Sequence, residues 1–395
     1  MSRPSLRSLG VLAASGAATI GAVLVPGALA AASAGASPAT TPLTAATVLN
    51  GSTLTHTFTV GGVTKSEPLS KPDDITMLGL DIFVGFQNGV GPQGQASTSG
   101  NLDSTVVEMT RSGKEVAQWD IAGKADGVTA DPYNDEVIAT VNEDANSSLY
   151  AITPTASAAT AVQHYAYNKP LPHHGGTDAI SVLNGQLVIS ASAPGTTGTK
   201  PAPQPTFPAA YWVSLDATTL VATIKPTFFD EAAARVANVT ATNYGRMVKL
   251  ALTDPDSSEI VPLGMPRFGG QYMLDSQGDQ QQIFLGNPDG TNHELSVLSL
   301  SQSVDDTAFP NGPGTLYATD STNDAVDVIR GTLPSGPVAA ATPCGANSAP
   351  PTCTTANYLS SINPWTGQVT ALTVGGVPFV PQGGLLYAPL PTPAG

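Results

Sequence analysis

Runs in which apolar and polar residues alternate recur along the chain, each bounded by turn-forming residues. Three examples are GSTLTHTFTVGG (51–62), SGKEVAQWDIAGK (112–124) and TGQVTALTVGG (366–376). Alternation with a period of two indicates a strand with one buried and one exposed face. A more uniformly apolar run follows each of them, namely LDIFVGF (80–86), DEVIATV (135–141) and GLLYAPL (384–390). These runs predict strands that are buried on both faces.

A third strand often follows, as in STVVEMT (104–110), SSLYAIT (147–153), AYWVSLD (210–216), ELSVLSL (294–300) and DAVDVIR (324–330). The segments form a turn-and-strand unit of about 50 residues, and repeats of that length are typical of a β-propeller. We therefore predict an all-β fold, a single β-propeller over 44–390 with seven blades, and six blades as the alternative. A pair of β-sandwiches is disfavoured because it would not produce the repeat.

The two ends of the repeat region complement each other. GLLYAPL near the C-terminus lacks outer strands, and THTFTVGG near the N-terminus lacks an inner partner. We expect the N- and C-terminal strands to pair within one blade and so to close the ring, which leaves no long exposed sheet edge.

The first residues are typical of an exported precursor. Arg3 and Arg7 precede a run of small apolar residues, Pro26 and Gly27 interrupt it, and Ala28-Leu29-Ala30 fits a cleavage site. We predict a signal peptide (1–30), a flexible tether (31–43) and a short tail (391–395), with the protein secreted or associated with the cell wall. A single membrane anchor is the alternative, which the shortness of the run disfavours.

Composition and charge narrow the classes of partner. Charged residues make up 11% of the chain, whereas Gly (40) and Pro (34) are abundant, which suits strands joined by turns. The formal net charge of −15 and the lack of a Lys/Arg cluster argue against nucleic acid as a partner. We expect a monomer without a membrane span after signal removal, and a small ligand or an extracellular protein or polysaccharide as its partner.

The two cysteines, Cys344 and Cys353, lie in a short loop rich in Pro and Gly. In an exported protein such a pair predicts a disulfide. A metal site or a redox pair would need His neighbours or C-x-x-C spacing, which this loop does not have.

The segment TGQVTALTVGGVPFVPQGGLLYA resembles the repeat of YVTN-type and NHL-type propellers, and DSTVVEMTRSGKEVAQWDIAGKADGVTADPYNDEVIATV is similar over one full repeat. The resemblance covers most of 46–390 and implies the propeller fold. Enzymes similar to gluconolactonase and to streptogramin lyase share this architecture, as do receptors and scaffolds. The resemblance therefore does not select one function.

Aspartates recur at one position of the repeat, where the chain enters an innermost strand: Asp73, Asp126, Asp178 and Asp305. In a closed propeller these positions surround one mouth of the channel, and their carboxylates would form a negative funnel that suits Ca²⁺. The alternative is structural, because Asp at a turn often accepts hydrogen bonds from nearby backbone N–H groups.

His173 and His174 come shortly before Asp178, and a neutral imidazole can act as a base or bind a metal. The alternative is an ordinary surface loop. The resemblance to streptogramin lyase implies a channel His with carboxylates and Mg²⁺, for which His174 with Asp178 is the local match. The Glu, Asn and Asp ligands implied by gluconolactonase-like enzymes are replaced here by aspartates.

The sequence thus predicts a secreted propeller that binds a ligand, a cation or a partner at its channel mouth, without evident catalysis. The segments LTDPDSSE (252–259) and LGNPDGTNHE (285–294) lack calcium-loop spacing and are interpreted as turns. A metal-dependent lactonase-like or lyase-like enzyme using His174 is one alternative. A cell-wall adhesion or scaffold module is the other.

Overall fold

The structure, a computed structural model, describes residues 41–172, 175–192, 207–287, 294–344 and 354–390. All of these residues belong to one compact unit, residues 40–395. Among the elements whose bounds are described, η1 (Gly51–Thr53) is a 3-10 turn and all the others are strands. No helix there is long and apolar enough to cross a membrane. The predicted signal peptide and tail lie outside the described residues.

Most strands form antiparallel groups of four, which we call blades. Blade 1 contains β4 (Pro72–Leu78), β5 (Asp81–Phe86), β6 (Asp103–Met109) and β7 (Glu115–Ala122). Blade 2 contains β8 (Ala125–Asp131), β9 (Glu136–Val141), β10 (Ser148–Ile152) and β11 (Val162–Tyr167). Blade 3 contains β12 (Gly176–Leu183), β13 (Gln186–Ser192), β14 (Pro208–Asp216) and β15 (Val221–Phe229). Blade 4 contains β18 (Pro255–Ile260), β19 (Tyr272–Ser276), β20 (Gln281–Gly286) and β21 (Glu294–Ser299).

The last two blades exchange segments of the chain. Blade 5 contains β22 (Val304–Ala308), β25 (Val338–Ala341), β26 (Tyr358–Ile362) and β27 (Val369–Ala371). Blade 6 contains β29 (Leu385–Pro389), β23 (Gly314–Asp320), β24 (Ala325–Arg330), β1 (Leu43–Asn50) and β28 (Val374–Gly376). After β22 the chain builds β23 and β24 of blade 6, returns for β25 to β27, and ends on β29.

The N- and C-terminal strands close the ring within blade 6. The strand order there is β28-β1-β24-β23-β29, so β1 and β29 belong to one sheet. The N-terminal contribution is β1 rather than the THTFTVGG segment, which pairs instead with the strand after it. That pair is a separate hairpin of β2 (Thr55–Val60) and β3 (Val63–Pro68).

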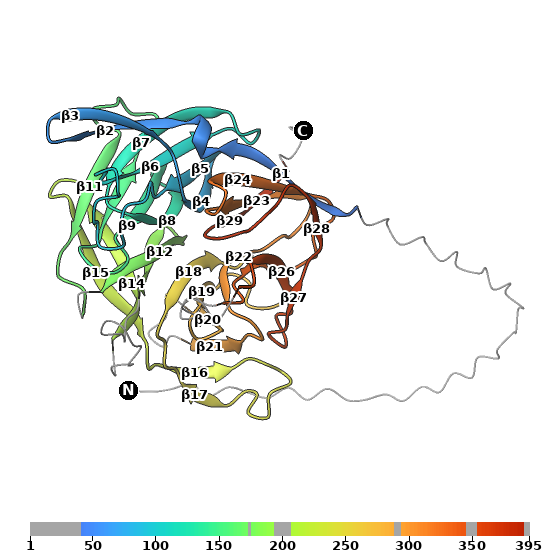
Figure 1. Ribbon diagram of the computed structural model, residues 1–395. Helices are drawn as coiled ribbons and strands as arrows, with labels where there is room; N and C mark the ends of the chain where they lie inside the picture. The colour runs from blue at the N-terminus through green and yellow to red at the C-terminus, as the bar shows by residue number, and fades with distance from the viewer. Residues whose placement is uncertain (1–40, 173–174, 193–206, 288–293, 345–353, 391–395) are drawn as a thin grey trace, which may run out of the picture. The chain divides into compact units, whose positions relative to one another are not determined.

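One strand of each blade lies at the centre. These inner strands are β4, β8, β12, β18, β22 and β29, and each contacts the next, with β29 returning to β4. Figure 1 shows them around a common centre, with the other strands of each blade outside them. The chain is therefore a β-propeller, as the repeat predicts.

Burial follows the position of a strand within its blade. The apolar strands β5 and β9 are buried at every residue after the first, because a neighbouring blade covers each of their faces. The outer strand β15 keeps buried and exposed residues in partial alternation. In the described residues, apolar clusters fill the interfaces between successive blades. Phe83 of blade 1 and Val137 of blade 2 belong to one such cluster, and Val107 of blade 1 and Tyr317 of blade 6 belong to another.

The described inner strands number six, and the number of blades, seven or six, stays a prediction. The repeat length predicts a seventh blade because it counts two hairpins whose strands lie outside the groups of four. One is β2–β3. The other is β16 (Ala233–Val236) with β17 (Met247–Lys249), which adds to the outer edge of blade 4.

Candidate functional site

The same irregularity occurs near the start of five inner strands. Two residues of the inner strand oppose one residue of its neighbour, which is a β-bulge, and the first bulged residue is an aspartate each time. The bulged pairs are Asp73-Asp74, Asp126-Gly127, Asp178-Ala179, Asp256-Ser257 and Asp305-Asp306. Repetition of one bulge around the axis brings the five Asp side chains to the same level of the channel.

At two of the bulges, a side-chain hydroxyl group of the preceding blade donates a hydrogen bond to a backbone carbonyl that has lost its partner in the β-sheet. Thr140 lies opposite the bulge of blade 2, and its Oγ1 donates to the carbonyl of Asp178 in blade 3. Ser190 of blade 3 donates in the same way to the carbonyl of Asp256, at 3.1 Å. These two carbonyls therefore have donors in the preceding blade, which compensates for the hydrogen bonds lost at the bulges.

The sixth inner strand has glycine at the position that carries aspartate elsewhere. Gly383 has a positive φ of 84°, and a Cβ there would lie 2.4 Å from the carbonyl oxygen of Asp73. Its N–H donates to Oδ2 of Asp305 at 2.6 Å. The close approach of the neighbouring backbone therefore requires glycine, and the described ring has carboxylates from five blades.

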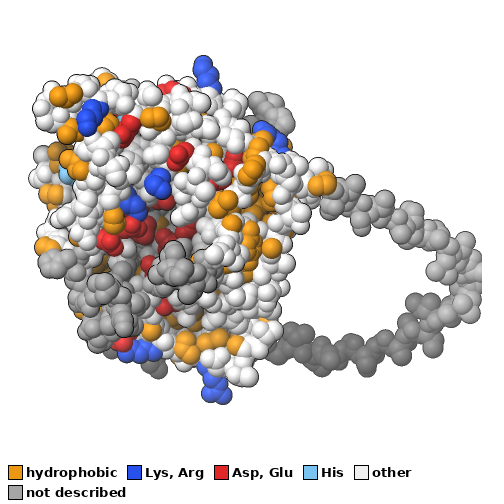
Figure 2. Space-filling model, viewed as in Figure 1, with side chains coloured by type: hydrophobic (Ala, Val, Ile, Leu, Met, Phe, Trp, Pro, Cys, Tyr) orange, Lys and Arg blue, Asp and Glu red, His pale blue; other side chains and the backbone are white. Residues whose placement is uncertain are grey.

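The five aspartates line one cavity of about 410 Å³ at this mouth of the channel. We call its acidic lining the acidic funnel, which consists of Asp73, Asp126, Glu143, Asp178, Asp254, Asp256 and Asp305. Figure 2 shows acidic side chains gathered in a hollow of the molecule. A narrower space of about 50 Å³, lined by the bulged residues, continues from the funnel along the axis.

The ammonium group of Lys124 faces these carboxylates. Its Nζ lies 2.8 Å from Oδ1 of Asp126 and also pairs with Glu143. The residue directly precedes β8, and Glu143 follows the adjacent strand β9. Both therefore reach the funnel from the same blade as Asp126.

Asp126, Glu143 and Asp178 form the tightest group of the funnel. One carboxylate oxygen of each lies within 4.8 Å of the others. Asp126 is 2% exposed, and its Oδ2 is buried without a hydrogen-bond partner. A buried oxygen without a donor is costly in a folded protein and indicates a group that something else satisfies.

Burial and mutual repulsion raise the pKa values of the funnel carboxyls. Burial raises the pKa of Asp73 to about 7, although Lys124 opposes the shift. The pKa of Asp126 lies well above its usual range because of burial and of Glu143. Burial and the nearby Asp126 raise the pKa of Asp178 well above its usual range. Burial and the nearby Asp305 raise the pKa of Asp256 in the same way. A site with so much negative charge would gain free energy from a cation.

The second bulged residues have a different role. Asp74 accepts hydrogen bonds from the N–H groups of Ile75 and Val128, at 2.7 and 2.6 Å. Asp306 accepts from the N–H groups of Thr307 and Leu385, both at 2.6 Å. Each carboxylate therefore ties the inner strand of its own blade to that of the next blade.

The four aspartates that the sequence indicates, Asp73, Asp126, Asp178 and Asp305, line the same cavity. Whether they bind a ligand stays a prediction. Sequence reasoning missed Asp256, Asp254, Glu143 and Lys124. Asp256 lies in the segment interpreted as turns, although it begins a bulge as the other four do. His173, His174 and Cys353 lie outside the described residues, so the histidine site and the disulfide with Cys344 also stay predictions.

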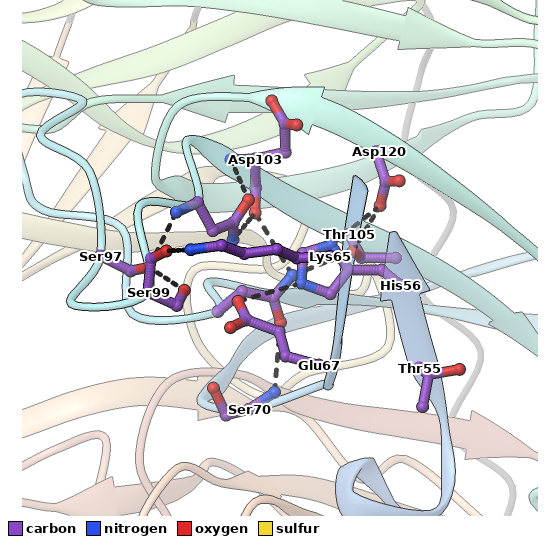
Figure 3. Close-up of polar contacts among 12 residues, drawn as sticks. Thr55, His56, Lys65, Glu67, Ser70, Ser97, Ser99, Asp103, Thr105 and Asp120 are labelled. Atoms are coloured by element: carbon purple, nitrogen blue, oxygen red, sulfur yellow. Dashed lines mark hydrogen bonds and ion pairs between the residues drawn. The ribbon is translucent and has the colours of Figure 1, made fainter. Parts of the chain in front are cut away.

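A second polar cluster lies under the β2–β3 hairpin (Figure 3). The buried His56 places Nε2 at 3.3 Å from Oε1 of Glu67 and Nδ1 at 3.7 Å from Oδ1 of Asp120. Thr105 of blade 1 donates to the same Asp120 oxygen at 2.7 Å. At the edge of the cluster, Lys65 donates to the carbonyl of Ser99 at 2.6 Å. These contacts fasten the hairpin to blade 1.

Comparisons with known proteins found distant likenesses among solved structures. No protein-family model matches the sequence, and no curated protein matches it. The Pseudomonas aeruginosa periplasmic gluconolactonase PpgL is 12% identical, with a TM-score of 0.43, over 89% of this chain and 100% of that one. The Swd1 propeller domain of Myceliophteria thermophila is 13% identical, with a TM-score of 0.40, over 82% and 81%.

Hydrazine synthase of Kuenenia stuttgartiensis is 13% identical, with a TM-score of 0.37, over 77% of this chain but 66% of that one, which is just under two thirds. These likenesses are too distant to carry an argument about activity. The fold assignment rests on the strand order and the closed ring of inner strands.

Proposed function

We propose that the protein binds a divalent cation in the acidic funnel, with Ca²⁺ as the expected ion. The observation that carries this proposal is Asp126, whose Oδ2 is buried without a partner beside Glu143 and Asp178. Three carboxylate oxygens within 4.8 Å of one another are a spacing that a single ion can bridge. Ca²⁺ takes six to eight oxygen ligands, and water can supply those that the protein does not.

The ligand types favour a hard cation over other occupants. The charged groups of the described funnel lining are carboxylates and two lysines, Lys71 and Lys124. No histidine is among the described lining residues, so the donor set is unlike that of a Zn²⁺ or Cu²⁺ site. An anion would meet strong repulsion from the carboxylates.

Cation binding would allow the protein to act outside the cell as a propeller that binds a second ligand through the ion. A bound divalent ion leaves coordination positions open, and a carboxylate or hydroxyl of a second ligand can fill them. The predicted export signal fits this role because extracellular fluids are richer in free Ca²⁺ than the cytosol. The lactonase-like or lyase-like enzyme and the cell-wall module stay predictions, since no observation favours either.

Isothermal titration calorimetry with CaCl₂ tests the proposal on protein freed of metal by chelation and dialysis. The wild-type chain should bind Ca²⁺, and Asp126→Asn should weaken binding by about tenfold or more. Asp135→Asn is the matched control, because Asp135 is exposed and has a positive φ that Asn tolerates. Absence of binding to the wild type, or equal binding by Asp126→Asn, would refute the proposal.

A further inference from the structure

A second cavity lies at the other end of the axial channel and differs from the funnel in its chemistry. Its volume is about 390 Å³, within the range of small-molecule sites. Its lining combines polar and apolar surface, and we call it the apolar cavity after its apolar residues Ile75, Met77, Val128, Ile180, Ile260 and Leu386. The narrow space lined by Asp74 and Asp306 lies between it and the acidic funnel.

Three carboxyl groups line the apolar cavity, and no Lys, Arg or His is among its described lining residues. Two of the carboxyl groups, those of Asp74 and Asp306, accept backbone N–H groups at both oxygens. The third belongs to Glu259 on β18, where one backbone group, that of Ile260, hydrogen-bonds it. No side chain in the described part of the chain donates to Glu259. It is therefore the carboxyl group that a ligand can use.

We propose that the apolar cavity binds a small organic ammonium ion. The ammonium group donates to the Glu259 carboxylate, and the carbon skeleton packs against the apolar lining residues. This inference does not rest on the proposed cation site, because the two cavities use different residues for their ligands.

The surroundings of Glu259 favour an organic cation over other ligands. Burial and the nearby Asp306 and Asp74 raise the pKa of Glu259 well above its usual range, so the ionised form gains from a bound cation. An anion would meet three carboxyl groups without a basic residue. A metal ion needs several oxygen ligands, whereas two of the three carboxylates are already bonded to backbone N–H groups. An organic ammonium ion can pair its charge with the Glu259 carboxylate and pack its apolar substituent against the apolar lining residues.

Isothermal titration calorimetry on the full chain tests this inference with benzylammonium chloride and benzyl alcohol, which share a shape and differ in charge. Benzylammonium should bind, and benzyl alcohol should bind at least about tenfold more weakly. Glu259→Gln should weaken benzylammonium binding by a similar factor, whereas Glu115→Gln, at an exposed strand position, should not. Equal binding of both compounds, no binding of either, or an unaffected Glu259→Gln variant would overturn the inference.

Two further readouts keep the test decisive. Glu259→Gln should bind Ca²⁺ as the wild type does, which separates this cavity from the acidic funnel. If Glu259→Gln does not fold, Tyr133→Ala replaces it. Tyr133 lines the cavity, and its 69% exposure makes its loss tolerable. Tyr133→Ala should weaken benzylammonium binding severalfold, and an unchanged affinity would contradict the proposal.

Discussion

Nζ of Lys124 lies 2.8 Å from Oδ1 of Asp126, so an ammonium group of the chain itself neutralises part of the acidic funnel. Burial alone would lower the pKa of Lys124, but Asp126 and Glu143 raise it above its usual value. The lysine therefore stays charged. A divalent cation that enters the funnel must share these carboxylates with Lys124 or displace it.

Replacing this lysine should strengthen metal binding. We expect Lys124→Gln to raise the affinity for Ca²⁺ by about tenfold, because a competing positive charge is removed from a buried site. Calorimetric titration of the variant measures the change. Lys114→Gln, which alters an exposed lysine in a turn, should leave the affinity unchanged. A weaker affinity in Lys124→Gln would mean that Lys124 organises the site instead of competing for it.

The stability of the metal-free protein should fall as the pH rises. Burial raises the pKa of Asp73 to about 7, whereas an unfolded Asp titrates near 3.9. The folded state then holds a proton that the unfolded state releases. The resulting stability is fully present below about pH 4 and is lost as the pH rises through about 7. Calorimetric melting should give a lower melting temperature at pH 8 than at pH 5.

Two additions attribute this pH effect to the funnel. Asp73→Asn should reduce the difference between pH 5 and pH 8, because the amide does not titrate, whereas Asp135→Asn should preserve it. Saturating Ca²⁺ should raise the melting temperature most at pH 8, where the carboxylates are ionised. A melting temperature that rises from pH 5 to pH 8 without metal would contradict the burial argument.

The two adjacent aspartates of one bulge, Asp73 and Asp74, should lose different properties when each is replaced by asparagine. Asp74→Asn should lower the free energy of unfolding by about 1–3 kcal/mol, because an amide cannot accept both backbone N–H groups. Asp73→Asn should cost little stability at pH 8 and should weaken Ca²⁺ binding instead. Urea unfolding and calorimetric titration of both variants measure the two effects. Similar losses of stability in both variants would make Asp73 a structural residue.

The β2–β3 hairpin should depend on His56. The ring lies buried between Glu67 and Asp120 and stacks on Phe58, with ring centroids 5.3 Å apart. His56→Ala should destabilise the protein by about 2–4 kcal/mol through lost packing and polar contacts. It should also increase hydrogen exchange in β2 and β3 while blades 2 to 5 keep their protection. Uniform loss of protection would show that the hairpin belongs to the cooperative core.

Local sequence patterns predicted the propeller because the buried strands and the outer strands of a blade have different patterns of apolar residues. The apolar run DIFVGF is buried on both faces in β5, which is what its sequence indicates. The exchange of segments between blades 5 and 6 was not predictable in the same way. Strands β23 and β25 are both short and mostly buried, and nothing in either sequence indicates which sheet it joins. The pairing depends on contacts between distant parts of the chain.

The candidate site was partly visible for the same reason. Asp73, Asp126 and Asp178 recur at one repeat position, so their common level follows from the repeat. Asp256 follows a proline, and Pro-Asp also favours a turn, which hid the same bulge in β18. Glu143 joins the funnel through the pairing of β8 with β9, which brings the end of β9 beside Lys124.

The most direct test of the account is anomalous diffraction from crystals of the protein soaked in a lanthanide or Mn²⁺ salt, with Ca²⁺ as the competing ion. The account predicts one anomalous peak in the acidic funnel, within coordination distance of Asp126, Glu143 and Asp178, with Nζ of Lys124 moved away from Asp126. Excess Ca²⁺ should abolish the peak. A funnel without a peak, with Lys124 still paired to Asp126, would contradict the proposed cation site.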